Sequence, residues 1–202
     1  MIKTTAIVLA GGQGTRMKSP LPKVLHPVAG QPMIARIISQ CQKADVDEIR
    51  LVVGHGQNLV KTVVEPFGVS TFVQEKQLGT GDAVKSAQVD SIEGDVIILN
   101  GDHPLLTAED FKSFISDFRE RKLDLAVVSV TLDQPKEFGR IVRQNNQLKT
   151  IVEAKDASAE TLKINEINTG IYVVKAAVLK KYIPQISRRI GTHCVLRGGS
   201  KT

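Results

Sequence analysis

Apolar runs alternate with amphipathic segments between residues 5 and 131. Short runs rich in β-branched residues predict strands at 5–10, 48–53, 69–74, 95–100 and 125–131. Between them, apolar residues at helical spacing predict helices at 32–44, 57–67, 79–87 and 107–119. Strands that alternate with helices in this way predict βαβ units, right-handed crossovers and a mostly parallel sheet of the α/β class.

The pattern changes after residue 131. Segments 139–143 and 148–153 predict a hairpin around Gln144-Asn145-Asn146-Gln147, and 157–163 predicts a short helix. Segment 166–174 predicts a strand that returns to the sheet, and 176–182 begins a helix that Pro184 ends. No linker divides the first 186 residues, so we predict one domain over 1–186 and an atypical basic tail, disordered or irregular, over 187–202.

The composition indicates which residues fill the core and in which cellular compartment the protein is expected. The 202-residue chain has no Trp and 4% aromatic residues, so Ile, Val and Leu must fill the core. No apolar run could span a bilayer and no secretory signal is visible, so we expect a cytoplasmic protein without a membrane partner. Cys41 and Cys194 make neither a disulfide framework nor a metal cluster, and Cys41 is expected to be a small buried hydrophobe.

The net charge of +6 invites a nucleic-acid hypothesis. Four of the cations, however, lie in the last sixteen residues, which contain no acid: Arg188, Arg189, Arg197 and Lys201. Taking these four from +6 leaves +2 for the rest of the chain. Scarce aromatics also argue against a surface that stacks bases, so we expect no nucleic-acid partner.

The first predicted strand ends in a glycine-rich turn, Gly11-Gly12-Gln13-Gly14, and Arg16 and Lys23 follow. Glycine lets backbone N–H groups approach phosphate oxygens without a Cβ in the way. The turn is neither a Walker A loop nor a dinucleotide fingerprint, because it lacks Gly-Lys-Ser/Thr and the third spaced glycine. Three glycines alone also suit an ordinary turn, but the added arginine and lysine favour a polyphosphate site.

Polar residues also follow the third and fourth predicted strands. Gln74 can offer a donor and an acceptor to a base edge, with Gly79 and Thr80 at the next helix start. Asp102 comes just after the fourth predicted strand. Open α/β sheets bind ligands at the carboxyl ends of their parallel strands, which is where this carboxylate would lie. Mg²⁺ prefers one or two carboxylates plus substrate phosphates, so Asp102 is the strongest metal candidate. Without a ligand, the segment around Gly79 and Thr80 would simply be a capped helix start, and Asp102 would simply be an aspartate that forms a turn.

Two polar residues of the later segment adjoin strongly apolar runs, Glu153 and Asn168. Buried polar groups need hydrogen-bond partners, and the hydroxyls of a sugar would supply them. The alternative is that Glu153 and Asn168 are polar residues at strand ends that are solvated by water and bind no sugar.

These motifs together resemble the signature of sugar-1-phosphate nucleotidyltransferases. The resemblance rests on Leu9-Ala10-Gly11-Gly12-Gln13-Gly14-Thr15-Arg16-Met17, Leu21-Pro22-Lys23, Gln77-Leu78-Gly79-Thr80-Gly81, Gly101-Asp102, Phe138-Gly139-Arg140-Ile141-Val142-Arg143, Ile151-Val152-Glu153 and Asn168-Thr169-Gly170. Within that family the pattern is similar to the N-terminal uridyltransferase domain of the bacterial bifunctional N-acetylglucosamine-1-phosphate uridyltransferase/glucosamine-1-phosphate acetyltransferases. It implies a Rossmann-like nucleotide-diphospho-sugar transferase fold, a mostly parallel mixed sheet with helices on both faces.

The resemblance also implies an activity and roles for residues. UMP would pass from UTP to N-acetylglucosamine 1-phosphate with Mg²⁺, giving pyrophosphate and UDP-N-acetylglucosamine for cell-wall precursors. Arg16 and Lys23 would act on the phosphates as catalytic residues, and Asp102 would bind Mg²⁺. The nucleotide contacts would be Leu9, Ala10, Gly11, Gly12, Gln74, Gly79 and Thr80. The sugar contacts would be Gly139, Glu153 and Asn168.

The family's domain continues past this length, with an asparagine as second magnesium ligand and then an acetyltransferase β-helix. We therefore expect a C-terminally truncated domain without acetyl transfer, and not the oligomer of the full-length family. The alternatives are a nucleotidyltransferase for another sugar phosphate and a truncated nucleotide-binding module with little or no activity. A basic RNA-binding protein is the weakest of the alternatives.

Overall fold

The computed structural model describes residues 2–186, which form two compact units. Unit 1 comprises the chain up to Ala126 together with Tyr172–Ile186, and unit 2 comprises Val127–Ile171. The chain passes from one unit to the other within strands β7 (Leu125–Thr131) and β10 (Glu166–Lys175). One domain over 1–186 stays a prediction, and the predicted tail over 187–202 lies outside the described residues.

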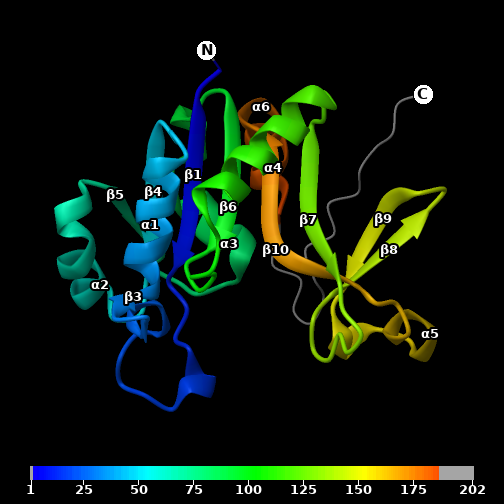
Figure 1. Cartoon of the computed structure of the whole chain (residues 1–202), viewed down its shortest axis with the longest axis horizontal. Helices are drawn as coiled ribbons and strands as arrows, with labels where there is room; N and C mark the ends of the chain where they lie inside the picture. The colour runs from blue at the N-terminus through cyan, green and yellow to red at the C-terminus, as the bar shows by residue number, and fades with distance from the viewer. Residues whose placement is uncertain (1, 187–202) are drawn as a thin grey trace. The chain divides into compact units, whose positions relative to one another are not determined.

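Unit 1 is built on a parallel sheet (Figure 1). Its parallel strands are β1 (Thr4–Ala10), β4 (Glu48–Val53), β5 (Ser70–Val73) and β6 (Asp95–Asn100), in the order β5-β4-β1-β6. The second half of β10 runs antiparallel beside β6. The continuously apolar β1, β4 and β6 are buried almost throughout, as strands covered on both faces must be. The predicted α/β class with a mostly parallel, mixed sheet is confirmed.

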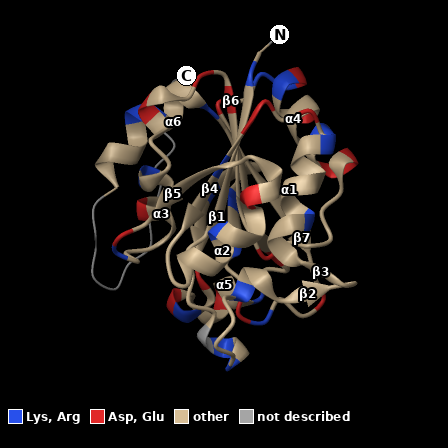
Figure 2. Cartoon of the chain, turned by 90° about the vertical axis from the view of Figure 1, so that its left-hand side faces the viewer, with Lys and Arg blue, Asp and Glu red and all other residues tan. Residues whose placement is uncertain are grey.

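Helices cover both faces of this sheet. They are α1 (Met33–Lys43), α2 (Gln57–Val64), α3 (Thr80–Ser86), α4 (Ala108–Glu120) and α6 (Ala176–Tyr182). Figure 2 shows α3 and α6 on one side and α1 and α4 on the other. Alternate strand residues such as Ile7 and Ile98 pack against Val84 of α3 and Leu179 of α6. The helical pattern thus buries one stripe of each helix against the sheet.

Helices α1 and α4 bury their own apolar stripes. The fully or almost fully buried side chains are Ile34, Ile37, Ile38 and Cys41 of α1, and Phe111, Ile115 and Phe118 of α4. Burial raises the pKa of the Cys41 thiol to about 12, which keeps it a neutral, small hydrophobe. Helix α4 begins with a capping box, in which Thr107 and Asp110 satisfy each other's backbone N–H groups.

Two features differ from the predicted elements. The helix predicted over 57–67 ends as an α-helix at Val64 and continues as a 3₁₀ turn, because Pro66 cannot donate the next backbone hydrogen bond. A two-stranded hairpin, β2 (Pro27–Val28) and β3 (Gln31–Pro32), was not predicted. Its strands are too short to show a period, and its turn places Ala29 and Gly30 at positive φ.

Short 3₁₀ turns connect the larger elements. Those outside the site are η3 (Glu65–Phe67), η4 (Val89–Ser91), η5 (Ala154–Asp156) and η6 (Ile183–Gln185). Segment η3 lies within the helix predicted over 57–67, and the other three were not predicted as separate turns, because one turn of helix has no periodicity to read.

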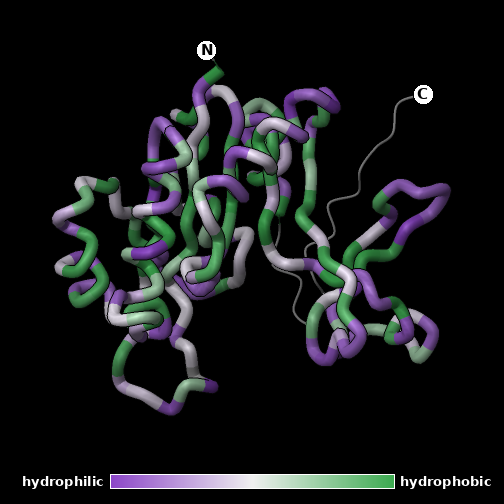
Figure 3. Tube along the Cα trace, in the orientation of Figure 1, coloured by the Kyte–Doolittle hydropathy of each residue, from purple (hydrophilic) through white to green (hydrophobic). Residues whose placement is uncertain are grey.

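Unit 2 contains the predicted hairpin, β8 (Arg140–Gln144) and β9 (Gln147–Val152). Asn145 and Asn146 form its turn at φ 51° and 61°, the left-handed conformation that two-residue hairpin turns need. The turn is hydrophilic (Figure 3). The first half of β10 pairs with β8, β7 pairs with β10, and the short helix α5 (Ala159–Leu162) is capped by Ser158. Within residues 2–186, no helix is long and apolar enough to cross a membrane.

Candidate nucleotide site

The strand order reverses between β1 and β6. After β1 the chain builds β4 and β5 on one side, and it then returns to place β6 on the other side of β1. In open α/β sheets, ligands bind at the carboxyl ends of the strands at such a switch point. The glycine turn follows β1 and Gly101-Asp102 follows β6, and the backbone N–H of Gly101 donates to Leu9 O at 2.8 Å. Both predicted loops therefore lie at the switch point.

The first glycine of the turn is fixed by close backbone packing. A Cβ placed on Gly54, after β4, would lie 2.8 Å from the carbonyl oxygen of Gly11. That same oxygen accepts hydrogen bonds from the backbone N–H of His55 at 3.2 Å and from Gln77 Nε2 at 2.8 Å. The turn is thus held from β4 and from the loop before α3, and it is not a free surface loop.

The last glycine of the turn lies against Lys23. Gly14 has φ +61°, and a Cβ on it would lie 2.7 Å from the Cβ of Lys23. Lys23 begins the 3₁₀ turn η2 (Lys23–Leu25), whose other two residues are buried and anchor it. Arg16 lies exposed in η1 (Thr15–Met17), directly after the glycines. Glycine is required at position 14 both for its backbone conformation and for this contact.

Lys23 forms an ion pair with Asp102, 79 residues further along the chain. The Nζ of Lys23 donates to Asp102 Oδ2, and the two side chains are 41% and 25% exposed. The predicted phosphate-binding lysine and the predicted metal-binding carboxylate are therefore together. A single, partly exposed carboxylate fits Mg²⁺ that arrives with phosphate ligands. Among residues 2–186, no group of three or more His, Cys, Asp or Glu side chains could hold a metal by itself.

Gln74 is buried beside the glycine turn, with 7% of its surface exposed. Its backbone N–H donates to Val53 O at 2.8 Å, which extends the β4–β5 pairing by one step. Its side-chain Nε2 donates to Gly79 O at 3.2 Å and to Asp82 Oδ2 at 3.0 Å. Its Oε1 lies 3.1 Å from where a Cβ on Gly11 would be. The structure thus brings the predicted base-contacting Gln74 and Gly79 next to the predicted phosphate loop.

Other predicted residues surround this group. Strand β1 ends with Leu9 and Ala10, and Gly12 lies in the turn that follows. Thr80 is the exposed first residue of α3. Two polar residues of the site were not predicted, Gln77 and Asp82. Gln77 belongs to the Gln77-Leu78-Gly79-Thr80-Gly81 motif, and this membership could have identified it as a residue of the site.

The three residues predicted to bind sugar come together within unit 2. The backbone N–H of Asn168 donates to Gly139 O at 2.9 Å. A Cβ on Gly139 would lie 3.4 Å from Glu153 Oε1. Asn168 Oδ1 accepts from the backbone N–H of Gly170 at 3.0 Å. Arg140 is buried next to Gly139 and donates to the carbonyl oxygens of Phe138 and Lys136, which fixes the preceding loop.

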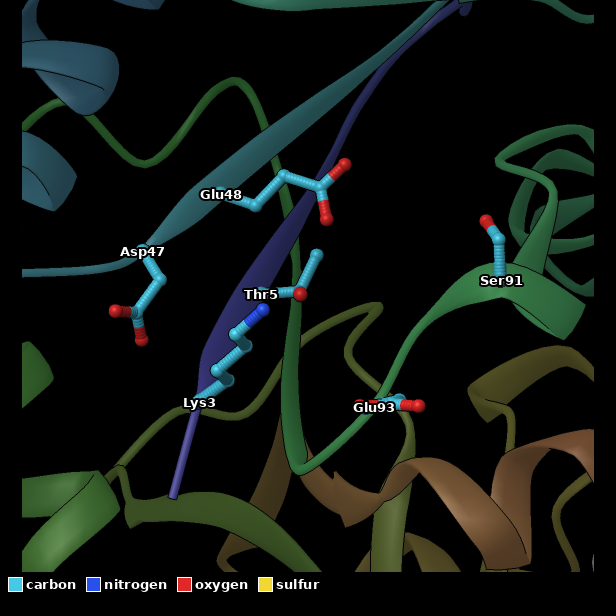
Figure 4. A pocket seen from close by; sticks show the side chains of 6 residues that line it. All are labelled: Lys3, Thr5, Asp47, Glu48, Ser91 and Glu93. Atoms are coloured by element: carbon cyan, nitrogen blue, oxygen red, sulfur yellow. The ribbon is translucent and has the colours of Figure 1, made fainter. Parts of the chain in front are cut away.

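A pocket lies at the opposite, amino-terminal end of β1 and β4 (Figure 4). It is lined by Lys3, Thr5, Asp47, Glu48, Ser91 and Glu93. Asp47 Oδ2 accepts from the backbone N–H of Thr4 at 2.7 Å, and Glu48 Oε1 pairs with Arg50 Nε at 2.7 Å. No predicted site residue lines this pocket, and these two carboxylates serve the fold.

Comparison with known families matches residues 6–162 to the MobA-like NTP transferase domain. The chain belongs to this family of NTP transferases. It is 63% identical over 183 residues to the bifunctional protein GlmU of Bdellovibrio bacteriovorus, covering 91% of this chain and 40% of that relative. It is 42% identical over 184 residues to the bifunctional protein GlmU of Marinobacter nauticus, again covering 40% of the relative. The chain thus spans about 40% of the length of these curated relatives.

Solved structures share the fold. A putative glucose-1-phosphate thymidylyltransferase from Bacillus anthracis, in complex with a sucrose, superposes with a TM-score of 0.76. It is 25% identical, and the match covers 91% of this chain and 76% of that chain. HddC from Yersinia pseudotuberculosis superposes with a TM-score of 0.69 at 24% identity, covering 90% of this chain and 80% of that chain. The resemblance found in the motifs and the Rossmann-like fold that it implied are both confirmed.

Proposed function

We propose that this NTP transferase passes UMP from UTP to N-acetylglucosamine 1-phosphate and releases pyrophosphate and UDP-N-acetylglucosamine. The observation that carries the proposal is the group at the β1–β6 switch point, where the glycine turn, Lys23 and Asp102 touch one another. The 63% identity to a bifunctional GlmU supports the choice of substrates. We place the reaction in the cytoplasm, as the sequence predicts.

The proposed reaction is an in-line displacement at the α-phosphorus of UTP. A phosphate oxygen of the sugar phosphate forms the new bond, and the bond from the α-phosphorus to the bridging oxygen of pyrophosphate breaks. The attacking phosphate is already ionised at neutral pH, so no general base is needed. What the chain must supply is alignment and charge neutralisation.

Residues of unit 1 suit that task. Backbone N–H groups of the glycine turn can donate to phosphate oxygens, because no Cβ lies between. Lys23 lies against Gly14, so its ammonium group can reach a phosphate held in the turn. Arg16 follows the turn and carries the planar, permanently charged fork that suits phosphate.

Asp102 is the residue that would hold Mg²⁺. When bound with the triphosphate, the ion would neutralise phosphate charge and so favour departure of pyrophosphate. Asp102 pairs with Lys23 in the described structure, so we infer that phosphate binding draws Lys23 away and leaves the carboxylate to the cation. In unit 2, we propose that the cluster of Gly139, Glu153 and Asn168 contacts the amino sugar.

The experiment is a pyrophosphate-release assay with UTP, Mg²⁺ and a panel of sugar 1-phosphates. We expect the highest kcat/KM with the N-acetylglucosamine compound. Turnover only with another sugar phosphate would keep the reaction but change the substrate. UTP binding without pyrophosphate release on any member of the panel would leave a nucleotide-binding module and refute the proposed enzyme.

A further inference from the structure

The side chain of Gln74 is held in one orientation by two acceptors. Its Nε2 donates both to the carbonyl oxygen of Gly79 and to the carboxylate of Asp82, at 3.2 and 3.0 Å. Turning the amide over would place Oε1 against two oxygens that cannot donate, which is electrostatically unfavourable in a buried place. Both donors of the amide are therefore used within the protein.

The remaining polar atom, Oε1, is left as a pure acceptor. It faces Gly11, where a Cβ would come within 3.1 Å, so the bare glycine leaves that side of the oxygen uncovered. Within residues 2–186, the hydrogen bonds of the Gln74 side chain are the two made by Nε2. The buried glutamine thus presents a fixed acceptor beside the phosphate turn.

We propose that Asp82 is a specificity-determining residue that acts by positioning Gln74, an inference that rests on the proposed use of UTP. Uracil has one donor on its base-pairing edge, N3–H, and an acceptor-only Gln74 must meet uracil at that atom. Cytosine in the same pose would direct the lone pair of its N3 at Oε1. Repulsion between two acceptors would then reject CTP, which is how a buried polar site discriminates similar ligands.

Asp82 contributes more to this orientation than Gly79 does. Its carboxylate carries a full charge and accepts without being able to donate, whereas hydrogen bonds to neutral carbonyls are weaker. Asp82 lies in the first turn of α3, a rigid element whose residues Ala83 and Val84 are buried in the core. The position of the carboxylate is thus set by the fold.

The test is calorimetric binding of UTP and CTP to the 202-residue chain and to Asp82→Asn. The asparagine keeps the shape but can donate as well as accept, so it tolerates either orientation of Gln74. We expect the UTP-to-CTP affinity ratio to fall about tenfold, the change expected from one charged hydrogen bond. Equal weakening of both nucleotides, with the ratio unchanged, would overturn the proposal.

A double-mutant cycle separates positioning from a structural effect. In Gln74→Met, the same Asp82→Asn change should leave the ratio unchanged, because the amide through which Asp82 acts is gone. A ratio that still falls in this background would overturn the proposal. Glu109→Gln is the matched control, because Glu109 is also an acid in the first turn of a helix, α4, and is exposed. This variant should leave the UTP-to-CTP affinity ratio unchanged.

Binding is measured without turnover, so the two proposals can fail separately. A chain that binds UTP selectively, loses selectivity in Asp82→Asn and forms no product would support the role of Asp82 and refute the proposed enzyme. A chain that makes UDP-N-acetylglucosamine but binds UTP and CTP equally well would refute the role of Asp82.

Discussion

Lys23 and Asp102 neutralise each other in the described structure. Their ion pair is partly exposed, with side chains 41% and 25% accessible, so water screens it and it stabilises the chain by at most about 1 kcal/mol. Such a pair can be replaced easily by a phosphate on the lysine and a divalent cation on the aspartate. Breaking the ion pair so that both charges can bind ligands would therefore cost the chain little stability.

The first prediction concerns this competition. Lys23→Gln removes the cation that occupies Asp102, so divalent metal should bind the nucleotide-free chain more tightly. We expect the dissociation constant for Mn²⁺, measured by electron paramagnetic resonance, to fall about two- to fivefold, the equivalent of the ion pair. UTP should bind more weakly to the same variant.

Lys112→Gln is the control, because Lys112 pairs with exposed Asp45 at 3.3 Å and lies in α4. It should leave the Mn²⁺ affinity as it is. Unchanged Mn²⁺ affinity in Lys23→Gln would contradict the assignment of Asp102 as a metal ligand that Lys23 masks.

At the scale of elements, β8 and β10 are joined by a charged side-chain network. Arg143 of β8 donates to Glu166 of β10 at 2.7 and 2.6 Å, and Ser129 of β7 donates to the same carboxylate at 2.5 Å. The hydrogen bond from Arg143 holds the pKa of Glu166 below its ordinary value of 4.5. The network therefore favours pairing of these strands only while the carboxylate is ionised.

The second prediction follows from the sign of that shift. Because the folded pKa is depressed, the stabilisation is fully present above pH about 4.5 and is lost as pH falls through the folded value. Hydrogen-exchange protection of β8 amides should therefore decrease in wild type below pH about 4.5, and less so in Glu166→Gln. The side chains of Arg143 and Glu166 are 45% and 22% exposed, so water screens the pair and the difference should stay below about 1 kcal/mol.

Glu160→Gln is the control for this measurement, since Glu160 of α5 forms an exposed ion pair with Lys163, which directly follows the helix. It should follow the wild-type pH profile. A Glu166→Gln profile that also matches wild type would show that the network does not stabilise the strand pairing.

Sequence periodicity predicted the larger elements well. β4, β6, β7 and α6 have the predicted bounds, because each is a long enough apolar or amphipathic run for its period to show. The two-residue strands β2 and β3 have no period, and their turn depends on positive φ at Ala29 and Gly30. These could not have been predicted from hydrophobic pattern.

The site was predictable where motifs mark it and not where it depends on distant contacts. The glycine turn, Gln74 and Asp102 each follow an apolar strand, so the sequence alone places them at one edge of the sheet. The Nε2 of Gln77 donates a hydrogen bond to the carbonyl oxygen of Gly11, 66 residues away, and only the folded structure shows that contact. The positioning of Gln74 by Asp82 likewise depends on the orientation of α3.

At the scale of the whole molecule, the two sets of predicted binding residues belong to different units. The residues proposed to bind the nucleotide lie in unit 1 and those proposed to bind the sugar lie in unit 2, each set held by its own hydrogen bonds. Substitutions in one unit should therefore affect one substrate selectively.

The third prediction tests that division. Glu153→Gln keeps the size of the side chain beside Gly139 but replaces the carboxylate by an amide, so it weakens hydrogen bonds to sugar hydroxyls. We expect KM for N-acetylglucosamine 1-phosphate to rise about tenfold. The dissociation constant of UTP should stay within about twofold, and Glu160→Gln should change neither value. A matching loss of UTP affinity would contradict separate binding by the two units.

We propose that this NTP transferase joins UMP to the sugar phosphate and does not simply hydrolyse UTP. Phosphorus NMR of the chain with UTP, Mg²⁺ and N-acetylglucosamine 1-phosphate follows every phosphorus at once. We expect the signals of UDP-N-acetylglucosamine and pyrophosphate to grow equally as both substrates disappear. Unchanged spectra, or UTP converted to UMP or UDP while the sugar phosphate signal stays constant, would contradict it.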